Sequence, residues 1–258
     1  MKYLVKIKYI GTAYCGFQCQ KNAVAVQNVL TDAAEKVFKC PCLVTGCSRT
    51  DAGVHALGFC ATLEPENNSS IPAGKLHRAF AQYLPADIAI VGASEVDESF
   101  HPRYSAKGKN YIYRIWDGPA EDPFLKGRTM RLTPTVREDQ LEKMKKACKS
   151  FVGKQDFSSF MAKGSKIVDT VRTVRSADIY RDSDGCIVFS VSADGFLYNM
   201  VRIMVGTLVD VAEGRIDPDG IGEIISACDR TRAGVTAPPE GLYLNEVFYS
   251  EDIKWKCD

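Results

Sequence analysis

The sequence predicts an α+β fold made of two mixed α/β subdomains with largely antiparallel sheets. Alternating strand patterns recur along the chain, and two of them meet at a short turn over residues 182–185. Helical patterns stand between groups of strands instead of following every strand, which argues against a parallel βαβ arrangement. We place the boundary near Ser105, giving subdomains 1–104 and 105–258.

The first half opens with an alternating strand and continues with a helix. Residues 2–9 place Tyr3, Val5 and Ile7 on one face, as a strand with one solvated face does. Residues 26–38 carry apolar side chains at the spacing of an amphipathic helix. Further strands are expected at 43–47, 58–63 and 88–96, and a helix at 72–84 between Pro72 and Pro85.

The second half repeats this mixture of strands and helices. Thr135 and Glu138 have the spacing of a capping box at the start of a helix. Asp217 followed by Pro218 is typical of another helix start. Residues 195–214 predict a long helix whose apolar side chains face inward. Strands are expected at 110–116, 168–180, 186–192 and 241–249.

Composition is that of an ordinary folded chain. The 258 residues include 45% hydrophobic and 25% charged residues, with a formal net charge of +1. A strongly basic total would indicate nucleic acid, but a near-neutral total does not exclude it, because a clustered basic face is sufficient.

Ten cysteines raise the question of metal or disulfides. The N-terminus has no apolar signal region, and no apolar run approaches the roughly 20 residues that span a bilayer. We therefore expect a cytoplasmic protein with reduced thiols and no membrane partner. No paired C-x₂-C unit is present, so no metal site is predicted, and zinc on the N-terminal cysteines is the minor alternative. Four cysteines are expected in the core: Cys60, Cys148, Cys186 and Cys228.

The densest group of reactive side chains lies in the polar turn 48–56, between two predicted strands. It offers the carboxylate of Asp51, the guanidinium of Arg49 and a hydroxyl from Thr50. Loops held by rigid strands commonly carry catalytic groups, and Gly53 permits a sharp turn. Local chemistry alone favours a plain structural turn in which Asp51 caps its own backbone.

A resemblance changes that balance. Residues 46–56, GCSRTDAGVHA, resemble the catalytic motif of the tRNA pseudouridine synthase A family. Ser48 departs from this motif at a place where glycine is frequent, which bears on substrate range more than on chemistry. Other blocks similar to that family follow in its order: 9–18, 26–27, 100–106, 109–114, 156–160, 170–172, 199–206 and 237–244.

The resemblance implies the pseudouridine synthase fold, with the two subdomains forming a central RNA-binding cleft. It implies isomerisation of uridine to pseudouridine in tRNA, at positions 38, 39 and 40 of the anticodon stem-loop, by base flipping and without a cofactor. It also implies tRNA as partner and a homodimer. The alternative is a non-catalytic RNA-binding module of the same fold.

The resemblance assigns roles to individual residues. Asp51 is expected to be the catalytic carboxylate, acting either as nucleophile or as general base. Arg49 is expected to assist base flipping, and Tyr111 to stack on the flipped base. Arg202 is expected to pair with Asp51; a charge inside an apolar helix calls for a partner in any case. Leu242 is expected to line the uracil pocket.

A further set of side chains is expected to contact RNA. For each basic residue in this set, the alternative is an ordinary solvated charge. We expect no catalytic role for His101 or His55. The expected RNA-contacting residues are Phe100, His101, Pro102, Arg103, Tyr104, Lys166 and Arg172.

Overall fold

A computed structural model describes residues 1–21, 23–67, 70–165, 167–249 and 253–257. The chain folds into two compact units. The first unit combines Met1–Lys107 with Tyr243–Asp258, and the second is Gly108–Leu242. The last strand thus returns to the first unit, a feature that the division at 104/105 does not contain.

The first unit is built on a mostly antiparallel sheet. Its strands are β1 (Lys2–Tyr9), β2 (Cys42–Gly46), β3 (His55–Pro65), β4 (Ile88–Val96) and β10 (Leu242–Tyr249). Strand β1 lies between β4 and β3, and β2 also pairs with β3. Strand β10 is the exception in direction, because it pairs parallel to β3 through Tyr243 opposite His55.

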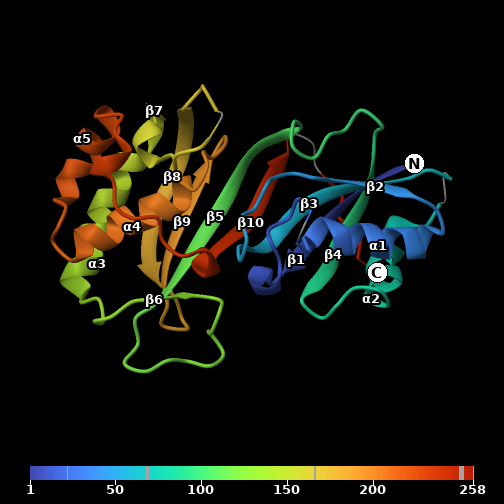
Figure 1. Cartoon of the computed structure of the whole chain (residues 1–258), viewed down its shortest axis with the longest axis horizontal. Coiled ribbons are helices and arrows are strands. Elements are labelled where there is room, and N and C mark those ends of the chain that lie inside the picture. Colours follow the sequence, from blue (N-terminus) through green and yellow to red (C-terminus); the bar gives the residue numbers. More distant parts are fainter. Residues whose placement is uncertain (22, 68–69, 166, 250–252, 258) are drawn as a thin grey trace. The chain divides into compact units, whose positions relative to one another are not determined.

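Two helices cover one face of this sheet (Figure 1). They are α1 (Val26–Phe38) and α2 (Leu76–Ala81), with short 3₁₀ turns at Gly11–Ala13 and Ala73–Lys75. The aromatic rings of Tyr3, Phe38 and Phe80 join sheet and helices: the first two stack at 5.7 Å and the last two meet edge-on at 6.1 Å. Burial of these large apolar side chains is the main stabilising term in such a core.

In the second unit, antiparallel strands pair in the order β5-β9-β8-β7. The strands are β5 (Ala106–Trp116), β7 (Gly153–Asp156), β8 (Val171–Arg181) and β9 (Ile187–Ala193), with the two-residue β6 (Met130–Arg131) parallel to β5. Strands β8 and β9 form the predicted hairpin, closed by the Asp182 amide, which donates to the Cys186 carbonyl at 2.8 Å, and by Gly185 at φ 84°.

The helices in the described part of this unit are α3 (Glu138–Cys148), α4 (Met200–Ala212) and α5 (Ile221–Ser226). Short 3₁₀ turns lie at Lys149–Phe151, Ser158–Phe160, Pro218–Gly220, Arg230–Arg232 and Pro239–Gly241. Asp217 accepts from the Asp219 amide ahead of Pro218, which confirms the predicted helix start. The predicted α+β class with largely antiparallel sheets is confirmed in both units.

Some local predictions are wrong. The face of β1 that was expected to be solvated buries Lys2 and Leu4. Thr135 does not cap α3: its hydroxyl donates to the Asp117 carbonyl, and the amide of Arg137 at the helix start donates to Gln140 instead. The helix expected at 195–214 begins only at Met200, because Asn199 has left-handed backbone angles. Cys228 is exposed, whereas Cys60, Cys148 and Cys186 are buried as expected. Within the described ranges, no helix is both long and apolar enough to cross a membrane.

Candidate active site

The turn between β2 and β3 gives Asp51 a defined backbone conformation. The Val54 amide donates to the Asp51 carbonyl at 3.2 Å, and Gly53 has φ 80°. A hydrogen bond from i+3 to i with positive φ at i+2 is the signature of a type II turn, which favours glycine at Gly53. Asp51 is half-buried and Arg49 is exposed on the same loop.

The segment after β1 packs against both sides of this turn. The Tyr9 hydroxyl and the Thr50 hydroxyl are 2.9 Å apart in a buried hydrogen bond. The Phe17 amide donates to the Thr50 carbonyl at 3.4 Å, and the Gly53 amide donates to the Tyr14 carbonyl at 3.2 Å. The residues directly before and two after Asp51 are therefore held by the same neighbouring segment.

Two glycines make that close approach possible. A Cβ added to Gly11 would lie 2.0 Å from the Val54 carbonyl oxygen, and one added to Gly16 would lie 2.2 Å from that of Thr50. Gly16 also has φ 81°, where an L side chain is strained. We call residues 9–17 the loop clamp, because glycine at these two positions lets their backbone touch the turn that carries Asp51.

His55 lies beneath the turn as a buried structural group. Its Nδ1 accepts a hydrogen bond from the Gly11 amide at 2.9 Å, so Nδ1 is unprotonated and the ring proton is on Nε2. The ring is 0% exposed and stacks on Tyr243 at 4.7 Å. These contacts account for a histidine at this position.

In the second unit, Tyr111 and Tyr113 lie on the same face of β5. Tyr111 is 7% exposed and meets the ring of Phe196 edge-on at 5.0 Å. The Tyr113 hydroxyl donates to the Pro238 carbonyl at 2.7 Å. Burial raises the pKa of Tyr113, as does the charge of Glu240, while Arg202 lowers it, so the net pKa is above the ordinary tyrosine value. Tyr113 is thus a neutral anchor for the segment that precedes β10.

Arg202 lies in the first turn of α4, where two oxygen acceptors hold its guanidinium. Its Nε donates to the Ala237 carbonyl at 2.7 Å, and its Nη1 donates to Asn199 Oδ1 at 2.8 Å. The Ala237 amide donates back to the Arg202 carbonyl at 3.1 Å. These contacts give the Arg202 charge the kind of polar partners that its place in an apolar helix predicts. The pairing of Arg202 with Asp51 stays a prediction.

Leu242 is 7% exposed and begins β10. It follows the 3₁₀ turn at Pro239–Gly241, where a Cβ on Gly241 would lie 2.5 Å from the Tyr113 ring. The close packing of Gly241 against the Tyr113 ring therefore fixes where Leu242 enters β10.

The segment expected to contact RNA divides into anchors and exposed groups. Phe100 is buried against Tyr249, with ring centroids 5.2 Å apart, and the Tyr249 hydroxyl donates to the Pro102 carbonyl at 2.9 Å. The amides of Arg103 and Tyr104 both donate to Nδ1 of the partly exposed His101. Tyr104 is 76% exposed, and the Arg103 guanidinium lies 5.9 Å from its ring.

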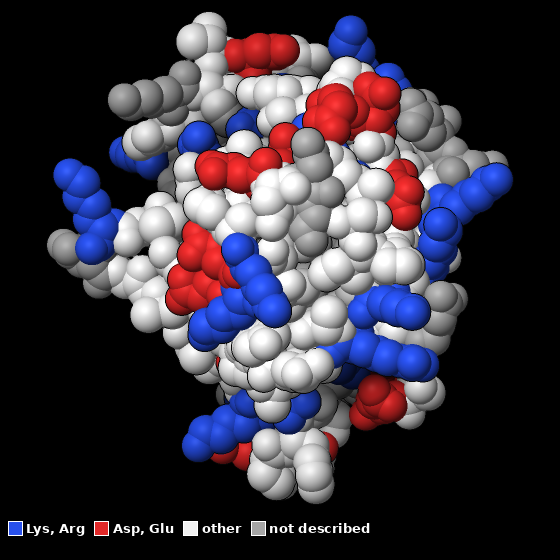
Figure 2. Space-filling view, turned by 90° about the vertical axis from the view of Figure 1, so that its right-hand side faces the viewer, with Lys and Arg blue, Asp and Glu red and all other residues white. Residues whose placement is uncertain are grey.

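The other basic residues of the predicted interface are less uniform. Arg172 is half-buried and donates to the carbonyls of Asp169 and Val171, at 3.0 and 2.5 Å. Lys166 lies outside the described residues. Figure 2 shows acidic and basic side chains interspersed on one face, so charge on that face does not single out a phosphate-binding surface.

Metal is not indicated by the described side chains. No group of three or more His, Cys, Asp or Glu residues there has the arrangement of a metal site, and the ten cysteines carry free thiols. The sequence predicts the turn, Tyr111 and Arg202 as site residues, and these stay predictions. It does not single out the hydrogen bond of Asn199 to Arg202, which depends on backbone angles, or the anchoring of Tyr113, two residues beyond Tyr111 on the same strand face.

Comparison with known proteins identifies the class of enzyme to which this chain belongs. A family model described as tRNA pseudouridine synthase matches residues 6–105 and 147–250, which include the Asp51 turn and Arg202. The protein is therefore an RNA-modifying isomerase. The chain belongs to the tRNA pseudouridine synthase family.

Full-length relatives support this membership. "tRNA pseudouridine synthase A" of Ruminiclostridium cellulolyticum is 44% identical over 248 residues, 96% of this chain and 99% of that protein. The protein of the same name from Thermoanaerobacter sp. (strain X514) is 44% identical over 246 residues, 95% of this chain and 98% of that protein. A solved Cbf5-Nop10-Gar1 complex aligns with a TM-score of 0.38 and 12% identity, over 96% of this chain and 50% of that chain, so the membership depends on the sequence relatives.

Proposed function

We propose that this enzyme converts uridine to pseudouridine at positions 38, 39 and 40 of the tRNA anticodon stem-loop, with Asp51 as its catalytic carboxylate. The observation that carries the proposal is the loop clamp: Thr50 and Gly53 are each bonded to residues of the 9–17 segment, so a half-buried carboxylate is held on a constrained turn. Catalytic groups need such support from their neighbours.

The reaction is an isomerisation and balances without a redox partner. The bond between N1 of the base and C1′ of the sugar breaks, and a bond between C5 and C1′ forms. The hydrogen on C5 leaves as a proton, and N1 gains one. Because atoms and electrons balance, the proposal includes no cofactor.

An ionised Asp51 serves either form of the chemistry. As a nucleophile it adds to the base or the sugar; as a general base it removes a sugar proton. We assign Arg202 the role of pairing with this carboxylate, which favours its ionised form. The backbone carbonyl of Ala237 and the side-chain oxygen of Asn199 support this role, because they restrict the direction of the Arg202 guanidinium.

The target base must leave its stack, at a cost of a few kcal/mol. We assign Arg49, exposed on the turn, to the displaced RNA, where a planar guanidinium suits phosphate. Tyr111 stacks on the flipped base and Leu242 lines the uracil pocket. Their low exposure, 7% each, supports a water-poor pocket.

Backbone contacts with tRNA are assigned to residues 100–104, Lys166 and Arg172. Arg103 and Tyr104 are exposed and supply a positive charge and an aromatic ring. Phe100 and Pro102 are buried and anchor this segment in the protein. We further propose that the protein is a homodimer, which joins two such surfaces for one tRNA, and that it works in the cytoplasm.

The test is site-resolved mapping of pseudouridine in unmodified tRNA after incubation with wild type, Asp51→Asn and Asp139→Asn. Asp139 is the control, an exposed carboxylate on α3. We expect product at positions 38–40 with wild type and Asp139→Asn, and a loss of about 10³-fold or more with Asp51→Asn, within the range for a removed acid–base group. Folded wild type that binds tRNA but forms no product would favour the non-catalytic alternative; product at other positions would overturn the site assignment.

A further inference from the structure

Asn199 has a backbone conformation that is unusual for the start of a helix. Three non-glycine residues in the described ranges have positive φ: Lys39, Asn199 and Cys228. Lys39 and Cys228 follow helices α1 and α5, where left-handed residues are common. Asn199 instead precedes α4, with φ 59° and ψ 11°, where the preferred conformation is extended.

The Asn199 side chain does not do what an N-cap side chain normally does. Asparagine at this position usually accepts a hydrogen bond from a backbone amide of the first turn, but no such bond forms here. Its Oδ1 accepts from Nη1 of Arg202 at 2.8 Å instead. The Asn199 carbonyl still accepts from the Ile203 amide at 3.0 Å, so α4 begins normally.

Two oxygen acceptors from distant parts of the sequence therefore bind the same guanidinium. Asn199 holds Nη1 and the Ala237 carbonyl holds Nε, at 2.8 and 2.7 Å. A guanidinium is planar and carries its donors in a rigid fork, so holding two nitrogens sets the direction of the whole group. Losing the Asn199 bond removes one of these two constraints.

We propose that Asn199 is a positioning residue, which directs the Arg202 guanidinium through Oδ1 and through its left-handed backbone. The proposal rests on the proposed function, in which Arg202 pairs with the catalytic carboxylate. Asparagine is suited to this task because, among non-glycine residues, it readily tolerates the left-handed region and carries a side-chain acceptor close to the backbone.

Substitutions at residue 199 separate the backbone from the side chain. Asn199→Gly keeps the left-handed conformation and removes the acceptor. Asn199→Asp keeps an acceptor oxygen and also tolerates left-handed backbone angles. Cys228→Gly is the matched control, because it replaces another left-handed residue of the same unit, here an exposed one, by glycine.

The first readout is independent of tRNA. The Nε–H resonance of Arg202, assigned in ¹⁵N NMR spectra by its loss in Arg202→Lys, reports the setting of the guanidinium. We expect it to shift in Asn199→Gly, to stay near its wild-type position in Asn199→Asp, and to be unmoved in Cys228→Gly. An Arg202 resonance unmoved in Asn199→Gly would overturn the proposal, whatever the activity.

The second readout is single-turnover kinetics on tRNA, below the unfolding midpoints of all variants. We expect Asn199→Gly to lower the rate of the chemical step about tenfold, as losing one oriented hydrogen bond does, with little change in KM. Asn199→Asp should recover most of the rate, and Cys228→Gly should match wild type. Equal rates in wild type and Asn199→Gly would sink this proposal alone, whereas an inactive wild type would sink the proposed function.

Discussion

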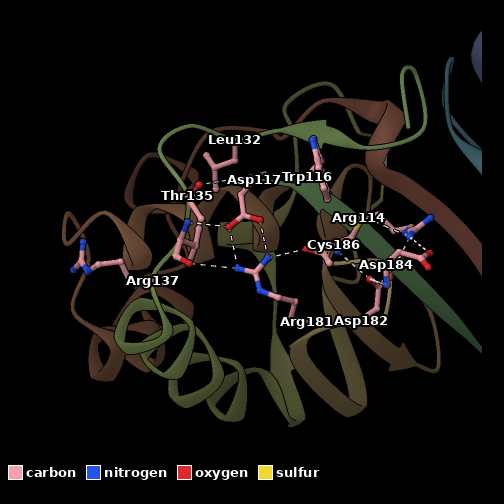
Figure 3. Close-up of polar contacts among 12 residues, drawn as sticks. Arg114, Trp116, Asp117, Leu132, Thr135, Arg137, Arg181, Asp182, Asp184 and Cys186 are labelled. Carbon is pink, nitrogen blue, oxygen red and sulfur yellow. Dashed lines mark hydrogen bonds and ion pairs between the residues drawn. The ribbon is translucent and has the colours of Figure 1, made fainter. Parts of the chain in front are cut away.

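Asp117 and Arg181 join the ends of two strands through paired hydrogen bonds, from Arg181 Nη1 and Nη2 to the two carboxylate oxygens at 2.7 and 3.0 Å (Figure 3). Asp117 follows β5, and its side chain is 1% exposed. It also accepts from the Val136 amide at 2.9 Å, just ahead of α3. Burial raises the pKa of Asp117, but the Arg181 and Val136 hydrogen bonds and the Arg181 charge outweigh it, so the net pKa lies below the ordinary value.

The first prediction concerns the stability of the second unit. Asp117→Asn breaks the ion pair and leaves a desolvated site with an imperfect partner, so the free energy of unfolding should fall by about 3 kcal/mol. Asp139→Asn removes an exposed pair with Arg137 and should leave the unfolding midpoint nearly unchanged. Urea unfolding measures both. Equal midpoints for Asp117→Asn and wild type would show that the pair contributes nothing.

The second prediction is the pH dependence of that contribution. Because the folded pKa of Asp117 is depressed, the stabilisation is present above the unfolded pKa and is lost as pH falls through the folded pKa. The stability difference between wild type and Asp117→Asn should be constant from pH 7 to about 5 and shrink below about pH 4. Unfolding curves at several pH values measure it. A difference that grows on acidification would contradict the direction assigned to this pKa.

Elements with local signals could be predicted from the sequence. Residues 2–9 and 26–38 were predicted with the observed bounds, because alternation and amphipathic spacing are properties of neighbouring residues. The helix start at Asp217-Pro218 and the hairpin at 182–185 have equally local causes. The polar turn that carries Asp51 belongs to the same group, since it stands between two short strands.

What could not be predicted depends on residues far apart in the chain. The Tyr9 and Thr50 hydroxyls meet across 41 positions, and Thr135 is drawn from its expected capping role by the Asp117 carbonyl. The late start of α4 follows from the left-handed backbone of Asn199, which bonds to Arg202 three residues on, while the same guanidinium is held by the distant Ala237 carbonyl. At Thr135 a tertiary hydrogen bond overrides a local preference for the helix cap.

The third prediction tests the loop clamp with two glycines. Gly16→Ala should place a methyl group against the Thr50 carbonyl at a backbone φ of 81°, so it adds a steric clash to the left-handed penalty. Gly214→Ala has φ 76° and open space, and so carries the conformational penalty of about 1 kcal/mol alone. The melting temperature and the rate of pseudouridine formation should both fall further in Gly16→Ala than in Gly214→Ala. Equal effects of the two substitutions would show that the close approach to Thr50 is unimportant.

The fourth prediction separates the ring of Tyr111 from its hydroxyl. Tyr111→Ala removes the stacking surface and should cost about 1–3 kcal/mol in binding of the flipped base. Tyr111→Phe keeps the ring, so any loss with it measures the hydroxyl. Tyr180→Phe, at an exposed position on β8, is the control and should match wild type. Single-turnover kinetics on tRNA measure all three, and a Tyr111→Ala rate equal to that of Tyr111→Phe would exclude stacking as the main role.

The fifth prediction concerns RNA affinity. Arg103→Ala removes an exposed charge that faces the Tyr104 ring, and it should weaken tRNA binding and lower the salt slope by about one charge. Tyr104→Ala should weaken binding while leaving that slope nearly unchanged, because a ring neutralises no phosphate. Arg137→Ala, which removes an exposed charge at the start of α3, is the control. Binding titrations between low and moderate salt distinguish these outcomes, and an Arg137→Ala effect as large as that of Arg103→Ala would mean that charge anywhere on the surface suffices.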